Sequence, residues 1–249
     1  MIQAYYRPKT LVEAERLLAE PGERRVPLGG GSVVSRAKDQ SYAVVDLQDL
    51  GLGSIEQEGK RLEIGSMATL ESMAQSSLIS AELKQVLLLS ASLNIRNQAT
   101  IAGYLVCADG RSPLAVALLA LDASTVWHPA EKRLSLGDWF TVGRAQGLFI
   151  TSLQFNTNVV IKYRQVARSP MDQPIVAAAI ARWESGRMRI ALGGFGSKPI
   201  LALDGQGAAG AAEAARSAFA NAEDHWASAE FRQDVAARLV TRMIEELTG

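Results

Sequence analysis

Three consecutive glycines and a serine, Gly29 to Ser32, follow the apolar stretch that begins at Val26. Glycine lacks a Cβ atom, so a backbone that turns here can bring its N–H groups to one side and close to a ligand. Such a concave group of N–H donors binds an anion, and a diphosphate is one candidate. A tight turn without any ligand would use the same residues. The stretch matches neither the P-loop motif nor the G-x-G-x-x-G spacing, so these four residues leave both interpretations open.

The other residue types that carry chemistry are scarce. Cys107 is the only cysteine, so the chain has no internal disulfide and cannot supply the four thiolates of an iron–sulfur cluster. His128 and His225 show no metal-ligand spacing and are interpreted as structural or surface residues. Lys plus Arg and Asp plus Glu both number 26, which argues against nucleic acid or an anionic membrane as a partner. Any redox chemistry would therefore need an organic cofactor.

A second stretch, from Asn94 to Ala123, combines small residues with turn and helix signals. Its middle, Thr100 to Tyr104, is another candidate for a close backbone approach to a ligand. Asp109-Gly110 is a common turn dipeptide. Ser112-Pro113 predicts the start of a helix, with serine as the N-cap and proline at the first helical position.

The elements that must position these residues begin with a small parallel unit. Thr10 predicts a helix start with Glu13 at the capping-box position, and the stretches RVPL and YAVVDL read as strands on either side of the glycines. Strand, helix and strand with short links favour a parallel arrangement over roughly the first fifty residues. Alternation and helical periodicity then predict helices at 69–76, 80–92 and from 113, and strands at 61–67, 124–128, 148–155 and 159–167.

The last third of the chain has a different pattern. Two apolar stretches on either side of Ser185-Gly186 predict a β-hairpin. The glycine- and alanine-rich stretch 203–215 reads as a loop that enters a helix, and an amphipathic helix with Phe231 and Leu239 on one face ends the chain. The sequence therefore predicts an α+β protein in about three parts. The absence of a signal-peptide pattern and of any stretch of transmembrane length favours a cytoplasmic protein without membrane insertion.

The stretch from Asn94 to Ala123 closely resembles the FAD-binding segment of the molybdenum hydroxylase flavoproteins. That family, which includes the carbon monoxide dehydrogenase medium subunit and the xanthine dehydrogenase FAD domain, typically reads I-R-N-x-A-T-I-G-G-N-L and then L-L-A-L-D-A. Five further stretches match family motifs in the same order: PLGGGSVVS, VVDL, LEIGSMATL, the pair KYRQVARSPMDQPIV and RIALGGFGSKP, and ASAEFR. The resemblance therefore extends along the whole chain.

The resemblance implies an α+β fold of the vanillyl-alcohol oxidase/CO dehydrogenase flavoprotein type. Residues 1–156 would form the FAD-binding domain, with a small parallel βαβ subdomain over about 1–52 and a mixed β subdomain over 53–156. Residues 157–249 would form a C-terminal α+β domain with a three-stranded antiparallel sheet.

The resemblance also implies which residues contact FAD. Two loops with unpaired N–H groups would hold the diphosphate, and Arg164 falls where related enzymes place a lysine that reaches the flavin. Phe149 or Ile150 would cover the isoalloxazine ring, although both also suit ordinary core packing. The full implied set is Leu28, Gly29, Gly30, Gly31, Ser32, Val33, Val34, Thr100, Ile101, Ala102, Gly103, Tyr104, Asp109, Arg111, Phe149, Ile150 and Arg164. No catalytic residue and no metal ligand is expected.

Four positions depart from the family pattern. Ala102 and Tyr104 replace a glycine and a small polar residue, Pro113 replaces an aspartate, and Val33 replaces an aspartate or serine. Asp109 and Arg111 lie in the same region and would partly substitute, since arginine suits phosphate.

The function implied by the resemblance is that of an FAD-dependent oxidoreductase subunit. Electrons would pass from the 2Fe–2S clusters of a small partner subunit through FAD to NAD, a quinone or another acceptor, and a large molybdopterin subunit would bind the substrate. The expected assembly is a heterohexamer of two heterotrimers. Two alternatives stay open: a scaffold or assembly subunit of the same fold that has lost FAD, and an FAD-linked oxidase of the vanillyl-alcohol oxidase type.

Overall fold

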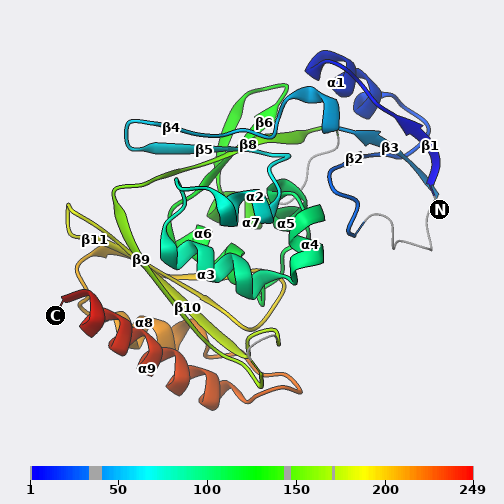
Figure 1. Cartoon of the computed structure of the whole chain (residues 1–249). Coiled ribbons are helices and arrows are strands. Elements are labelled where there is room, and N and C mark those ends of the chain that lie inside the picture. Colours follow the sequence, from blue (N-terminus) through cyan, green and yellow to red (C-terminus); the bar gives the residue numbers. More distant parts are fainter. Residues whose placement is uncertain (1, 34–40, 143–146, 170–171, 249) are drawn as a thin grey trace. The chain divides into compact units, whose positions relative to one another are not determined.

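The computed structural model describes residues 2–33, 41–142, 147–169 and 172–248 (Figure 1). The chain divides into two compact units, and each is built from separate stretches of sequence. The first unit contains Met1–Leu78, Ala91–Cys107 and Ser124–Phe155. The second unit contains Ile79–Ser90, Ala108–Ala123 and Asn156–Gly249.

A three-stranded parallel sheet begins the first unit. Its strands are β1 (Ile2–Tyr6), β2 (Arg25–Leu28) and β3 (Tyr42–Asp46), in the order β1-β3-β2. Helix α1 (Leu11–Ala19) begins after Thr10, whose hydroxyl accepts a hydrogen bond from the N–H of Glu13 at 3.2 Å. Its buried leucines pack against Val45 and Leu47. The predicted parallel unit and the helix start are both confirmed.

A five-stranded sheet in the order β4-β5-β8-β6-β7 forms the second part of the first unit. Its strands are β4 (Ile55–Glu58), β5 (Arg61–Gly65), β6 (Ser124–His128), β7 (Lys132–Ser135) and β8 (Phe149–Asn156). The helices of this part are α2 (Leu70–Gln75), α4 (Leu93–Gln98), α5 (Ile101–Cys107) and α7 (Leu136–Val142), and a 3₁₀ turn covers Gln48–Leu50. The side chain of Arg96 joins two of these helices, because it donates to Glu71 and to the carbonyl of Ala91, both at 2.8 Å.

The second unit is a four-stranded antiparallel sheet in the order β12-β11-β10-β9. Its strands are β9 (Val159–Val166), β10 (Val176–Trp183), β11 (Arg187–Gly193) and β12 (Ile200–Gln206). Helices α8 (Ala211–Ala218) and α9 (Ala229–Thr248) lie on one face of the sheet, and α3 (Ala81–Ser90) and α6 (Pro113–Ala120) lie on the other (Figure 1). Strand β10 is therefore buried over most of its length.

The α+β class and the flavoprotein type of fold are confirmed, but the three-stranded sheet is wrong. Part of the stretch expected to be a loop, 203–206, lies within β12. Gly205, Gly207 and an aspartate hide this strand in the sequence, because glycine and aspartate are depleted in strands. The aspartate, Asp204, is held by Arg187 and Arg189 on the neighbouring strand, at 2.8 and 2.7 Å, so the strand tolerates it.

Candidate functional site

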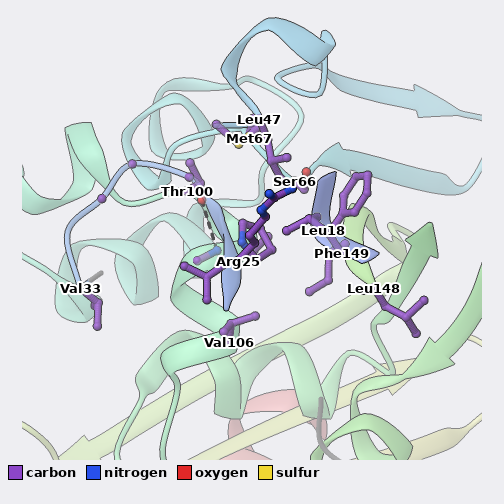
Figure 2. Close-up of a pocket in the computed structure, with 18 of the residues that line it drawn as sticks. Leu18, Arg25, Val33, Leu47, Ser66, Met67, Thr100, Val106, Leu148 and Phe149 are labelled. Atoms are coloured by element: carbon purple, nitrogen blue, oxygen red, sulfur yellow. Dashed lines mark hydrogen bonds between the residues drawn. The ribbon is translucent and has the colours of Figure 1, made fainter. Parts of the chain in front are cut away.

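A cavity of about 520 Å³ lies within the first unit (Figure 2). Its lining comes from β2 and the glycines after it, the end of α1, the residues that follow β5, helix α5 and the start of β8. This volume is within the range of small-molecule and cofactor sites. Among the residues that the structure describes, no cluster of three or more His, Cys, Asp or Glu side chains could hold a metal ion.

The glycine stretch forms one wall of the cavity and packs directly against a second backbone segment. A Cβ atom on Gly30 would lie 1.5 Å from the carbonyl oxygen of Gln98, and one on Gly29 would lie 2.5 Å from the hydroxyl of Thr100. Gly31 has a φ of +72°, in the left-handed region that other residues rarely adopt. The glycines are therefore required because two stretches about seventy residues apart in sequence meet here without room for side chains.

The two stretches differ in the hydrogen bonds that they leave open. The N–H groups of Gly29 and Gly30 make no hydrogen bond to any residue that the structure describes. The N–H groups at the start of α5 are all used: those of Ile101, Ala102, Gly103 and Tyr104 donate to Ala68, Ser66 and Thr100, the last through both its hydroxyl and its carbonyl. The expectation of unpaired N–H groups in both stretches is therefore wrong for the second. That stretch also forms a helix rather than a loop. It shapes the wall of the cavity and does not supply free N–H donors.

The opposite part of the cavity is apolar. Phe149 and Trp127 are 2% and 4% exposed, and Leu18, Leu47 and Met67 complete this wall. The indole N–H of Trp127 donates to the hydroxyl of Thr125 at 2.8 Å, which satisfies its one polar atom and fixes the ring. Figure 2 shows Phe149 and Leu18 on the same side of the site. A flat ring system of a ligand would be desolvated well by such a wall.

Two buried polar atoms of the lining have no hydrogen-bond partner among the described residues: the hydroxyl of Ser66 and Nε of Arg25. Other contacts fix the position of the Arg25 guanidinium. Its Nη1 donates to Glu20 and to the carbonyl of Leu17, and the group lies over the ring of Tyr6. The hydrogen bond to Glu20 raises the pKa of Arg25 above its ordinary value, so the group is a fixed cation.

Most of the implied FAD contacts lie in the first unit, but they do not all line the cavity. The lining includes Gly29, Gly30, Gly31, Ser32, Val33, Thr100, Ala102, Gly103, Phe149 and Ile150. Leu28, Ile101 and Tyr104 are neighbours in sequence that do not contribute to the lining. Val34 lies outside the described residues.

Three implied contacts belong to the second unit and have partners there. Asp109 accepts from the N–H of Arg111 at 2.9 Å, and Arg111 forms an ion pair with Asp224 at 2.7 Å. Arg164 forms ion pairs with Glu82 and Glu246, at 3.0 and 2.7 Å. None of the three lines the cavity of the first unit.

Sequence reasoning missed much of the lining. Leu18 and Leu47 read as core residues, and Arg25, Ser66 and Met67 lie inside strand motifs whose alternation says only that one face is buried. Trp127 was part of a predicted strand with no role assigned. The one available signal was position, because Arg25 immediately precedes the apolar stretch that leads into the glycines.

Known proteins resemble this chain over most of its length. The family described as the FAD binding domain in molybdopterin dehydrogenase matches residues 1–155. The chain belongs to this family. The uncharacterized protein YgfM of Escherichia coli K12 is 30% identical over 213 residues, which cover 82% of this chain and 79% of that protein. The carbon monoxide dehydrogenase medium chain of Afipia carboxidovorans is 27% identical over 97% of this chain and 95% of its own length.

A solved structure shares the fold over nearly the whole chain. A chain of reconstituted CO dehydrogenase from Oligotropha carboxidovorans has a TM-score of 0.80 and 27% identity, and the match covers 96% of this chain and 95% of that one. The resemblance to the FAD-binding subunits of molybdenum hydroxylases is thereby confirmed.

The residues present fit FAD. The glycine wall offers N–H donors at Gly29 and Gly30 that have no partner among the described residues. The apolar wall of Leu18, Trp127 and Phe149 suits a ring. The cavity therefore combines N–H donors suited to a diphosphate with an apolar wall suited to a ring system.

Proposed function

We propose that this chain is the FAD-binding electron-transfer subunit of a molybdopterin-dependent hydroxylase or dehydrogenase, and that the cavity of the first unit binds the FAD. The family match over residues 1–155 supports this proposal, and the observation that carries it is the glycine wall packed against Gln98 and Thr100. The N–H groups of Gly29 and Gly30 have no partner among the described residues and belong to the cavity wall, where an anion could accept from them.

The chain's own residues would bind and orient the cofactor rather than react with the substrate. Gly29 and Gly30 would donate their N–H groups to the diphosphate, and Phe149, Trp127 and Leu18 would exclude water from one end of the cavity. FAD, when bound, supplies the electron transfer, because it accepts and releases electrons one or two at a time. No acid, base or nucleophile among these residues is required.

The proposal includes partner subunits. Cys107 is the only cysteine, so the 2Fe–2S clusters belong to a separate small subunit, and the molybdopterin that oxidises the substrate belongs to a large one. The relatives named as carbon monoxide dehydrogenase support this division. We infer electron flow from the 2Fe–2S clusters through FAD to NAD or another acceptor, in a cytoplasmic heterohexamer of two heterotrimers. Among the described helices, none has both the length and the apolar character needed to cross a membrane.

The first experiment measures flavin in the purified chain. We expect a visible flavin spectrum and nearly stoichiometric FAD after acid release, with apo protein recovering FAD on titration. A tagged chain expressed in its own host should also retain a 2Fe–2S subunit and a molybdopterin subunit through purification. A folded, colourless protein that does not respond to added FAD would overturn the proposal.

The alternative is a scaffold subunit of the same fold without a cofactor. One observation favours it: Ala102, which stands where the family has glycine, is one of the residues that line the cavity. The FAD titration distinguishes a flavin-binding subunit from a scaffold subunit. Repeating it with an Ala102→Gly variant tests whether the alanine prevents FAD binding. A chain that binds FAD only after this substitution would support the scaffold.

A further inference from the structure

The four-stranded sheet of the second unit has a long, regular strand at one edge. Strand β9 pairs with β10 without a break in register, from Val159 opposite Trp183 to Val166 opposite Val176. No strand in the described part of the chain pairs with the other side of β9. Val160 on this strand is 56% exposed. An edge strand of this kind presents N–H and C=O groups with which a strand of another molecule can pair.

Two side chains cover the backbone of β9 at its centre. Tyr163 donates its N–H to Oε1 of Glu82 on helix α3 at 2.9 Å, and its carbonyl accepts from Nη1 of Arg164 at 2.8 Å. Nη1 of Arg164 also donates to Oε1 of Glu82 at 3.0 Å. Because a residue in an antiparallel ladder directs its N–H and C=O to the same side, both groups of Tyr163 point away from β10. The carboxylate and the guanidinium therefore lie where the C=O and N–H groups of a further strand would lie.

Arg164 is held in this position from both faces of the sheet. Its Nη2 donates to Glu246 of α9 at 2.7 Å, whereas its Nη1 contacts Glu82 of α3. Helices α9 and α3 pack on opposite faces of the sheet (Figure 1). The side chain of Arg164 therefore reaches across the edge and connects the two helices.

The backbone groups on either side of Tyr163 are open. The direction of N–H and C=O alternates along a strand, so those of Ile161 and Gln165 point to the same edge as those of Tyr163. Among the described residues, these N–H and C=O groups of Ile161 and Gln165 have no hydrogen-bond partner. An approaching strand would find two open positions with a covered one between them. A continuous ladder along β9 therefore requires that Glu82 and Arg164 move away.

We propose that Glu82 and Arg164 cover the free edge of this sheet and thereby prevent two copies of the chain from pairing through β9. A second copy fits this edge, because two β9 strands can pair antiparallel about a two-fold axis. Such a dimer would have to break the hydrogen bonds of Tyr163 to both side chains in each copy. The strand at the other edge, β12, has an irregular register, which hinders pairing in a different way. This role of the two side chains is independent of FAD binding.

Glu82→Ala removes the acceptor of the Tyr163 N–H and one partner of Arg164. We expect this variant to dimerise with a dissociation constant at least about tenfold lower than that of the wild type, because pairing no longer has to break those hydrogen bonds. Sedimentation velocity of the purified full-length chain over a range of concentrations measures the constant. Hydrogen exchange should show the β9 amides better protected in the dimer than in the monomer.

Two further variants separate the covering role from a general loss of charge. Glu82→Gln keeps an oxygen that can accept from the Tyr163 N–H, so its self-association should stay close to that of the wild type. Asp234→Ala is the matched control, since Asp234 is a carboxylate on α9 that pairs with Arg216 and Arg238. In the described part of the chain it makes no hydrogen bond to β9. Its replacement should leave self-association unchanged.

Gln165→Pro tests whether the association uses β9. Proline has no N–H, and the N–H at this position points to the free edge, so the pairing with β10 is kept. Added to Glu82→Ala, it should restore the wild-type association, and thermal unfolding checks that each variant is folded. A Glu82→Ala chain that associates no more than the wild type would overturn the covering role. Association that persists in the folded double variant would overturn it as well.

Discussion

At the scale of single residues, the wall of the cavity depends on glycines, which have no Cβ atom. Gly29 and Gly30 are needed because the opposing backbone occupies the space that a side chain would fill. The sequence indicated this only through the number of glycines, and a flexible turn has the same composition. Distances to Gln98 and Thr100 distinguish the two cases, because a merely flexible glycine has open space around its missing Cβ.

Gly30→Ala should therefore damage the site. Its new Cβ would meet the carbonyl oxygen of Gln98, and the backbone must move apart. We expect a loss of about 1–3 kcal/mol in the free energy of unfolding, as for other overpacking substitutions, and FAD binding weaker by about tenfold or more. Denaturant unfolding and flavin titration measure these effects.

Gly53→Ala is the control for this substitution. Gly53 has nothing within 4 Å of the position of a Cβ atom and does not have a positive φ. Its effect on unfolding should stay within about 0.5 kcal/mol. Equal effects of the two substitutions would contradict the close-packing argument.

At the scale of elements, the start of helix α5 connects the two walls of the cavity. Thr100 accepts a hydrogen bond from the N–H of Gly103 at 3.2 Å through its hydroxyl, and the same side chain lies against Gly29. One residue thus both caps a helix and shapes the glycine wall.

Thr100→Val keeps the shape of the side chain and removes the hydroxyl. We expect it to cost about 1 kcal/mol of stability, typical of a lost helix cap, and also to weaken FAD binding. Thr10→Val removes the equivalent cap of α1, where Thr10 accepts from Glu13, and should cost a similar amount without affecting FAD. Thermal unfolding and flavin titration of both variants check this. Unchanged FAD affinity in Thr100→Val would show that the cap and the cavity are independent.

Elements with regular patterns could be predicted, and those stabilised by tertiary contacts could not. Helix α1 has a cap and an apolar face in its own sequence, and the hairpin around Ser185-Gly186 is local. Strand β12 contains Gly205 and Asp204, and only its pairing with β11 makes it a strand. The same holds in the cavity: the glycine stretch was found by its motif, but Ser66 was not. The orphaned hydroxyl of Ser66 is a property of its surroundings.

At the scale of the whole molecule, the second compact unit contains a partly buried ion-pair cluster around Asp224. In the second unit, Asp224 accepts hydrogen bonds from Arg232, which is fully buried, from Arg111 and from the backbone N–H of Trp226. Burial alone would raise the pKa of Asp224, but the hydrogen bonds from Arg232 and from the backbone N–H groups of Trp226 and Ala227 outweigh it and lower the pKa to about 2. The unfolded chain therefore binds a proton at this residue more readily than the folded chain does.

This difference gives Asp224 a stabilising effect that depends on pH. The contribution is complete above an unfolded pKa of about 4 and is lost as the pH falls toward 2; from the shift it amounts to about 2 kcal/mol. Asp224→Asn should remove that part of the pH dependence. At neutral pH it should cost about 3–5 kcal/mol, because Arg232 becomes a buried charge without its partner.

Asp234→Asn is the matched control, since Asp234 is more exposed and pairs with Arg216 and Arg238 on the surface. Its effect should be at most about 1 kcal/mol. Denaturant unfolding of the wild type and both variants between pH 2 and pH 7 measures the difference. A wild type and an Asp224→Asn variant with parallel stability curves would contradict the argument.

The division of the chain into interleaved stretches has a consequence for protein synthesis. Helix α6, all of whose side chains are buried, is translated well before strands β10 and β11, against which it packs. Until those strands leave the ribosome, α6 has α3 as a packing partner, but the side of the helix Pro113–Ala120 that packs against β10 and β11 stays uncovered on the nascent chain. The first unit, by contrast, has all its strands and helices once Phe155 has been added. The flavin-binding half can therefore form early, whereas α6 needs protection from aggregation until the C-terminal sheet has been synthesised.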